Sequence, residues 1–297
     1  MQRITFELKN QIDYFYKQSN SWFAYASFIW INLFESENEN YFQQMWENAF
    51  VISYKKGEAR EREDQHPIIS VPYLINTNDQ QLSELKKFVL ENNIEHIEYL
   101  TENEAQKLEK YFEIYENEER TFEVIYSQER FKNFTGIKGK KSIVNSFLKK
   151  FPDYRFVEYE KKHEPEVLKL LNHREVTTKH PSYDFEEQGI RFVTENYEKF
   201  ENLIWFLLFV WNKIAGFSFG EIWNNDTFIS YFMKGDNQYK WSYQAIQYLI
   251  ANHKSLENIK YFNYTNLTSI PWIKEMKLQL KPEKILKSYV AIPKKEK

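Results

Sequence analysis

The spacing of apolar residues in the first part of the chain predicts helices, followed by an alternation of strand and helix. Residues 1–60 carry aromatic side chains at helical spacing, which predicts helical segments there. The β-branched and apolar run 68–75 predicts a strand, and the apolar period that starts at Asp79 predicts a capped amphipathic helix ending near Asn92 and Asn93.

A second strand–helix pair is predicted directly afterwards. Residues 96–100 read as a short strand, and Thr101 is followed three residues later by Glu104, which is a capping-box pattern. That pattern opens a helix through Leu108. Residues 122–126 then predict another strand.

The rest of the chain continues the alternation and adds three successive strands joined by short turns. Helices are predicted over 140–151, 164–171, 185–200 and 241–253, and strands over 154–159, 203–211, 213–222, 227–233, 259–264 and 285–292. This order predicts an α+β fold with mixed sheets. Because domains cluster near ~100 to 150 residues, we expect two halves, residues 1–120 and 121–297.

Composition excludes several classes of protein. The chain has 297 residues, of which 42% are hydrophobic and 28% charged, so global disorder is excluded. It has no Cys, which excludes disulfide frameworks, iron–sulfur clusters and thiol nucleophiles. The longest apolar run, 203–211, is half a membrane span, and the N-terminus does not resemble a signal peptide. We therefore expect a cytoplasmic protein without a transmembrane segment.

The net charge of −3 hides a local asymmetry. Residues 91–123 hold eleven acidic and three basic side chains, whereas 131–150 holds six Lys and no acid, and 274–297 holds eight basic and three acidic side chains. These runs are either solvated helix faces or basic surfaces that bind an anionic substrate.

Common catalytic and cofactor motifs are absent from the sequence. There is no dinucleotide-binding glycine motif, P-loop, zincin motif or Gly-x-Ser-x-Gly elbow. The six His are dispersed, and no pair has the spacing of a helical metal site. We expect no metal site.

The segment Gly136–Phe147 is the strongest candidate for an anion site. It places Lys138, Lys140 and Lys141 beside two glycines at a predicted helix start, with Asn145 one turn further on. A helix N-terminus with ammonium groups suits a phosphate. The alternative is a flexible turn before a helix with an exposed lysine-rich face.

Several short motifs from about residue 96 to the C-terminus match those of one known family. They are Glu123–Ser127, Gly136–Phe147, Gly216–Glu221, Lys234, Tyr243–Ile246, Asn263, Lys277 and Lys281–Pro282. On these residues the chain resembles the phosphatidylglycerol lysyltransferase C-terminal-domain family. The resemblance implies two tandem GNAT-like domains.

The chain departs from the family at Trp241, which replaces a glycine, and at Lys274, which replaces an arginine. It also departs at Met233 and over residues 264–267, where the carboxylates of the family motifs are missing. In GNAT enzymes that use acetyl-CoA, glycines between strand and helix bind the pyrophosphate through their backbone amides. Here Trp241 and Tyr243 stand at the two glycine positions, which disfavours CoA because large side chains obstruct that approach.

The resemblance implies a transferase that moves an acyl or aminoacyl group to an amine or hydroxyl, with aminoacyl-tRNA as its donor. Tyr126, Asn145 and Asn263 are the catalytic candidates, the two amides as donors to the reacting carbonyl and the phenol as a proton handler. The substrate-binding candidates are Lys138, Lys140, Lys141, Lys234, Gln244, Lys274 and Lys277.

Two other functions remain open at this point. The missing carboxylates favour a catalytically degenerate protein that binds an anionic ligand, such as a phosphorylated small molecule or an RNA end. A plain acetyl-CoA-dependent N-acetyltransferase is the second alternative. Peripheral contact with a phospholipid head group is a further expectation.

Overall fold

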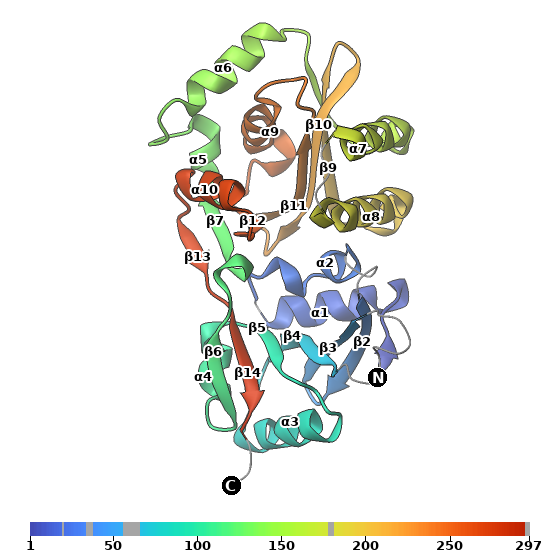
Figure 1. The fold of residues 1–297 in the computed structure, drawn as a ribbon, viewed down its shortest axis with the longest axis vertical. Coiled ribbons are helices and arrows are strands. Elements are labelled where there is room, and N and C mark those ends of the chain that lie inside the picture. Colours follow the sequence, from blue (N-terminus) through green and yellow to red (C-terminus); the bar gives the residue numbers. More distant parts are fainter. Residues whose placement is uncertain (20, 34–37, 56–65, 178–180, 295–297) are drawn as a thin grey trace. The chain divides into compact units, whose positions relative to one another are not determined.

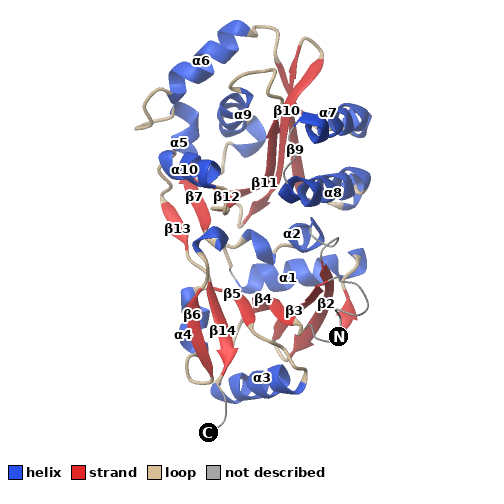
Figure 2. Cartoon of the chain, in the orientation of Figure 1, coloured by secondary structure: helices blue, strands red, loops and turns tan. Residues whose placement is uncertain are grey.

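The computed structural model describes residues 1–19, 21–33, 38–55, 66–177 and 181–294. The chain forms two compact units, which Figures 1 and 2 show. Unit 1 comprises Met1–Phe122 and Leu286–Lys297, and unit 2 comprises Glu123–Ile285. The division expected from the sequence assigned residues 121–297 to the second half, whereas residues 286–294 group with the first unit in the structure.

Unit 1 is built on a mixed sheet in which β4 and β5 pair in parallel and the other neighbours are antiparallel. Its strands, in spatial order, are β1 (Gln2–Arg3), β2 (Asn38–Met45), β3 (Asn48–Lys55), β4 (Ile68–Tyr73), β5 (Ile97–Leu100), β14 (Tyr289–Pro293) and β6 (Phe112–Glu116). Its helices are α1 (Lys9–Ser19), α2 (Phe28–Leu33), α3 (Asp79–Glu91) and α4 (Glu102–Leu108).

Two helices of unit 1 begin with the capping geometry that their sequences favour. The Thr101 hydroxyl accepts from the Glu104 N–H while the Glu104 carboxylate accepts from the Thr101 N–H, so the predicted capping box is confirmed. Asn78 and Gln81 make the same reciprocal pair at the start of α3. Each box satisfies two backbone N–H groups at the helix start.

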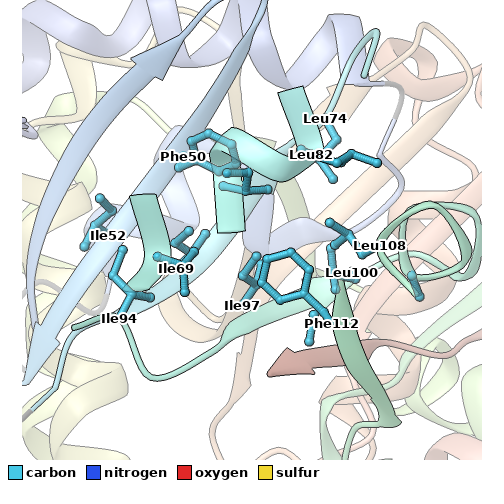
Figure 3. Close-up of a cluster of buried hydrophobic side chains, with 14 residues drawn as sticks. Phe50, Ile52, Ile69, Leu74, Leu82, Ile94, Ile97, Leu100, Leu108 and Phe112 are labelled. Atoms are coloured by element: carbon cyan, nitrogen blue, oxygen red, sulfur yellow. The ribbon is translucent and has the colours of Figure 1, made fainter. Parts of the chain in front are cut away.

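The core of unit 1 is an aliphatic and aromatic cluster between α3, α4 and the sheet (Figure 3). Leu82, Leu85 and Val89 lie one helical turn apart on α3 and are buried, which is the amphipathic stripe predicted from the sequence. Ala291 of β14 belongs to the same cluster. The C-terminal strand is therefore part of the core of the first unit.

The helical prediction for residues 1–60 is wrong over β2 and β3. These strands form a hairpin in which Met45 pairs with Asn48. Six consecutive residues of β3 from Asn48 are buried, so side chains on both of its faces are covered. Burial on both faces removes the period-two signal of a strand. Residues 56–60 of that prediction lie outside the described part of the chain.

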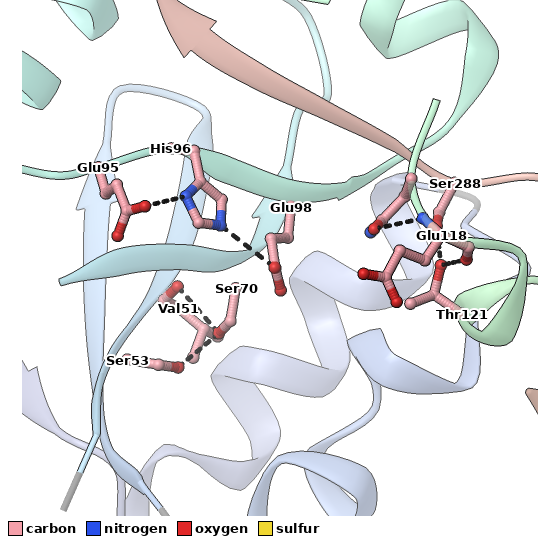
Figure 4. A network of polar contacts seen from close by, with 10 residues as sticks. Val51, Ser53, Ser70, Glu95, His96, Glu98, Glu118, Thr121 and Ser288 are labelled. Atoms are coloured by element: carbon pink, nitrogen blue, oxygen red, sulfur yellow. Dashed lines mark hydrogen bonds and ion pairs between the residues drawn. The ribbon is translucent and has the colours of Figure 1, made fainter. Parts of the chain in front are cut away.

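The single strand predicted over 285–292 is two strands. β13 (Lys284–Leu286) is an edge strand of unit 2, and β14 is inserted between β5 and β6 of unit 1. Ser288 lies at the break, where its hydroxyl contacts that of Thr121 at 2.8 Å (Figure 4). Its carbonyl accepts from the Asn117 N–H at 2.9 Å. The hydrophobic pattern does not record a change of sheet, because both strands have similar side chains.

A polar cluster beside β5 contains His96 between two carboxylates (Figure 4). Burial lowers the pKa of His96, but hydrogen bonds and charge interactions with Glu98 and Glu95 outweigh it, so the net pKa is raised above its ordinary value. The two carboxylates therefore favour the protonated form of His96.

Unit 2 is built on a second mixed sheet, in which β11 and β12 pair in parallel. Its strands, in spatial order, are β13, β7 (Glu123–Ser127), β12 (Tyr261–Asn266), β11 (Thr227–Gly235), β10 (Lys213–Trp223), β9 (Leu203–Val210) and β8 (Arg155–Glu158). The α+β class with two mixed sheets is confirmed.

Helices lie on both faces of the second sheet, with α9 on one face and α7 and α8 on the other (Figure 1). The helices of unit 2 are α5 (Gln128–Asn133), α6 (Lys140–Lys150), α7 (Glu164–Thr177), α8 (Pro181–Glu195), α9 (Ser242–Ala251) and α10 (Pro271–Gln279). The sequence patterns had not indicated α5 or α10, because α5 is short and α10 has no buried residue.

Candidate functional site

The most distinctive feature of unit 2 is the early separation of its two parallel strands. β11 and β12 pair only over Thr227–Ile229 and Tyr261–Asn263, whereas β11 continues to Gly235. A separation between parallel strands exposes backbone in the middle of a sheet, which is a place where an extended ligand can bind.

A β-bulge lies on β11 just beyond this separation. Phe219 of β10 pairs with Phe232 and Gly220 pairs with Ser230, so Tyr231 is the extra residue. The Tyr231 hydroxyl donates a hydrogen bond to the carboxylate of Glu221 on β10. Neither residue of this pair is among the site residues predicted from the sequence, although Gly220 within a strand followed by a carboxylate is a signal for such a bulge.

Lys234 lies on the same face of the sheet as Glu221. By register Lys234 pairs with Phe217 and Glu221 lies four residues further along β10, so their side chains leave the same side. Lys234 is buried, with its ammonium 5.6 Å from the centre of the Phe232 ring. A cation and a carboxylate thus share a largely aromatic face, the one that α7 and α8 cover.

The loop between β11 and α9 is built differently from a glycine loop. Trp241, the residue before α9, has φ +74° and so occupies the left-handed region that favours glycine. The Tyr243 hydroxyl donates to the Met233 carbonyl of β11 at 2.8 Å. That carbonyl, on the strand where an extended ligand would pair, already has a partner.

The lysines of the Gly136–Phe147 segment lie around the N-terminus of α6. Lys138 and Lys141 are exposed, as is Asn145, whereas Lys140 is half-buried. Burial lowers the pKa of Lys140 below its ordinary value. Gly139 precedes the helix with φ +80°, and no side chain caps α6. The first turn therefore presents backbone N–H groups and ammonium groups together.

Asn263 is fully buried in β12, away from solvent. Its amide donates to the buried carboxylate of Glu123 on β7, and its carbonyl oxygen accepts from the Thr265 N–H at 2.7 Å. Both polar groups of the side chain are therefore engaged with the core. This geometry favours a structural role for Asn263 over contact with a substrate.

Tyr126 and Lys277 are also engaged in internal contacts. The hydroxyl of the fully buried Tyr126 donates to the Lys277 carbonyl at 2.8 Å, and burial raises the pKa of this phenol well above its usual range. The Lys277 ammonium donates to the backbone carbonyls of Tyr264, at 2.7 Å, and Asn266. These bonds fasten α10 to the end of β12.

The structure thus sorts the predicted residues into separate groups. Tyr126 and Asn263 are buried in the core around β12, and Lys277 is half-buried on α10 with its ammonium on the end of β12. Lys234 lies on β11. The α6 group is on another element, and Gln244 and Lys274 are half-buried on α9 and α10.

We expect Lys277→Met to destabilise unit 2 by about 1–3 kcal/mol, because two backbone carbonyls lose a charged donor. Urea unfolding followed by tryptophan fluorescence measures this change. Lys281→Met is the matched control, since Lys281 is exposed, and it should stay within about 0.5 kcal/mol. Equal stability of the two variants would contradict the structural role and return Lys277 to the ligand-binding candidates.

In the described ranges no group of three or more His, Asp or Glu side chains gathers as a metal site requires. Nor does any helix there have the length and apolarity to cross a bilayer. A polar hollow of about 450 Å³ lies in unit 1 at the start of α3, and none of the predicted site residues lines it.

Comparison with known proteins shows the fold. No protein-family model and no curated protein matches the sequence. Among solved structures, a conserved protein of unknown function from Bacteroides thetaiotaomicron is 21% identical with a TM-score of 0.83, and 98% of each chain is covered.

Two further solved structures cover 98% of this chain. FemX is 10% identical with a TM-score of 0.65 over 97% of its own length. The C-terminal domain of a protein designated a lysylphosphatidylglycerol synthetase, from Agrobacterium fabrum, is 12% identical with a TM-score of 0.61 over 92% of its length. As the resemblance of its motifs predicts, the chain has the tandem GNAT-like fold that these structures share.

Proposed function

We propose that the protein is an acyl- or aminoacyltransferase whose reaction takes place in unit 2, at the separation of β11 from β12. The observation that carries the proposal is the bulged Tyr231, hydrogen-bonded to Glu221 just beyond the point where the two strands part. Bulges re-aim side chains next to active sites. The fold supports transferase chemistry by analogy, and the dyad supplies groups that can move a proton.

The reaction that fits these groups is aminolysis of an ester. The nitrogen of an acceptor amine attacks the carbonyl carbon of the aminoacyl ester, a C–N bond forms, and the C–O bond to the ribose breaks. Glu221 accepts the proton that the amine loses and returns it to the leaving ribose oxygen, while Tyr231 orients the carboxylate. The positive charge of Lys234 on the same face favours an anionic donor.

Aminoacyl-tRNA is proposed as the donor in preference to CoA. Tyr243 covers the Met233 carbonyl, and Trp241 occupies the left-handed position where a glycine would let phosphates approach the backbone. The lysines at the start of α6 are free of such obstruction and supply contacts for a polyanion. The proposed donor-binding residues are Lys138, Lys140, Lys141, Lys234, Gln244 and Lys274.

The test measures binding and turnover with the same purified protein. Radiolabelled aminoacyl-tRNA, prepared by charging bulk tRNA, is incubated with the protein and a mixture of small amines, and loss of the ester is followed. We expect protein-dependent transfer that Glu221→Gln slows at least 100-fold, the usual lower bound for loss of a general base, while filter binding of the tRNA is unchanged. Glu257→Gln, an exposed carboxylate of unit 2, is the control.

Two other results would contradict the proposal, and each would support a different function. Saturable binding of acetyl-CoA with acetyl transfer would establish the N-acetyltransferase alternative. Binding of tRNA without loss of the ester would support the degenerate binding protein, which the burial of Tyr126 and Asn263 favours because two of the three catalytic candidates are engaged in the core.

A further inference from the structure

Three loops of unit 2 meet at one end of its sheet: the α6–β8 connection, the β9–β10 turn and the β11–α9 loop (Figure 1). Phe151, which follows α6, joins them. Its ring centre lies 5.3 Å from that of Trp211 in the β9–β10 turn and 5.7 Å from that of Tyr239 in the β11–α9 loop. Phe151 and Tyr239 are buried, so these contacts fix the loops relative to one another.

Trp211 breaks the local rules for its position. It is the first residue of a two-residue turn, since Val210 pairs with Lys213, and its φ is +49°. Such turns strongly favour Asn, Asp or Gly, because a side chain with positive φ is strained. The indole is nevertheless 60% exposed, so burial does not compensate for the strain. Its ring contact with Phe151 covers only part of the indole, and a residue that violates local preference while it stays largely exposed is typical of a functional surface.

Three cations lie on or next to the same loops, and each has a contact of its own. The Lys150 ammonium lies 5.2 Å from the centre of the Phe151 ring, and the Lys240 ammonium lies 4.8 Å from that of Trp241. The Arg155 guanidinium stacks over Phe209 at 4.9 Å and donates to the side chain of Asn212, next to Trp211, at 3.3 Å. Positioned cations lose less entropy on binding an anion.

Charge and amide groups complete the surface. Its exposed basic residues are Lys149, Lys150, Arg155, Lys213 and Lys240, against the acidic Asp153 and Asp236. The exposed amides of Asn212, Asn237 and Gln238 lie on the same loops. The surface therefore combines an exposed aromatic ring, an excess of positive charge, and donors and acceptors that can pair with base edges. We call these loops the aromatic–basic platform.

We propose that the aromatic–basic platform binds an unpaired nucleic-acid strand, with a base stacked on Trp211 and phosphates held by Lys150, Arg155 and Lys240. This inference rests on the proposed function, because it gives the RNA donor a contact beside the loop that leads into α9. The platform lies at the C-terminal end of α6, about 15 Å along the helix from the lysines at its start. It is therefore a second contact for the same polyanion.

A lipid surface fits the platform less well. Insertion into a bilayer interface needs several exposed apolar side chains, and here Phe151 and Tyr239 are buried, at 2% and 7% exposure. A single exposed ring flanked by amides suits a base, which presents a flat face and polar edges.

The test is fluorescence anisotropy with a fluorescently labelled single-stranded RNA of eight nucleotides that carries no aminoacyl group. We expect Trp211→Ala to weaken binding about tenfold, the effect of losing one stacked base. Trp46→Ala is the matched control: Trp46 stands in the two-residue turn between β2 and β3 of unit 1, has φ +56° and is 40% exposed. Lys150→Gln and Lys240→Gln should each reduce the slope of log K against log salt by about 0.7.

Three outcomes would overturn the platform. The first is an equal effect of Trp211→Ala and Trp46→Ala on RNA binding. The second is tighter binding of an eight-base-pair RNA duplex than of the single strand. The third is Trp211-dependent binding to vesicles containing phosphatidylglycerol without binding to RNA. These outcomes differ from a failure of the proposed function. If RNA binding depends on Trp211 but no aminoacyl transfer occurs, the platform stands and the proposed function fails. Transfer from charged tRNA that is insensitive to Trp211→Ala retains the function and rejects the platform.

Discussion

The variant Ala291→Asp is expected to lower the free energy of unfolding of unit 1 by about 4 kcal/mol or more at pH 7, because it buries a carboxylate in an apolar core. Ala291 is fully buried in β14, where it pairs with Ile97 of β5 on one side and Ile114 of β6 on the other. An effect of this size is a large part of the stability of an ordinary domain.

The sign of the pH dependence follows from the same burial. In the folded variant, desolvation would raise the pKa of the introduced carboxyl above its unfolded value. The substitution therefore destabilises the protein least below the pKa of the unfolded state, where the carboxyl is protonated in both states. It destabilises the protein most above the pKa of the folded state. We therefore expect the difference from the natural protein to shrink as the pH falls from 7 to 4, measured by urea unfolding at each pH.

The neighbouring position supplies the control for this variant. Ile292 alternates to the other face of β14 and is 41% exposed, so Ile292→Asp should cost about 1 kcal/mol or less. If the two variants were equally stable, β14 would not complete the core of unit 1 as described here.

The second large effect is expected at Gly220, where Gly220→Ala should destabilise unit 2 by about 4 kcal/mol or more. A Cβ at this position would lie 1.8 Å from the Ile229 carbonyl oxygen and 2.8 Å from its carbon, which are backbone atoms of the paired strand. Relief requires β10 and β11 to move apart, and losses above about 4 kcal/mol are characteristic of such backbone conflicts.

Gly220 also links stability to the proposed chemistry. The register shift between Phe219 and Gly220 is what makes Tyr231 a bulged residue and sets its hydroxyl on Glu221. Ser218→Ala is the matched control, because Ser218 lies two residues away on the same face and loses only its contact with Ser230, about 1 kcal/mol. A stable Gly220→Ala variant would show that the two strands pair differently.

Sequence patterns predicted the elements whose signals are local. The capping box at Thr101 and the stripe of Leu82, Leu85 and Val89 need only the residues of their own helix, and the structure confirms both. The fold class could be predicted for the same reason, since the order of helices and strands is a property of the chain.

The candidate site depended on contacts that no local pattern records. Tyr126 and Asn263 carry the right functional groups for catalysis, but their partners, the Lys277 carbonyl and the Glu123 carboxylate, are 151 and 140 residues away in the sequence. Conversely, Glu221 ends one of the family motifs without being singled out as a site residue, and Tyr231 belongs to none of those motifs. They meet because one bulge shifts the register of two strands.

The sequence by itself therefore determined which segments are helices or strands, wherever one face is apolar and the other polar, because that periodicity is written in consecutive residues. The tertiary structure decided what each segment pairs with. It sent residues 289–293 back into the first sheet, parted β11 from β12, and held Trp211 exposed in a strained turn. The physical reason is that pairing and burial are set by residues distant in the chain, whose influence is absent from any short stretch of sequence.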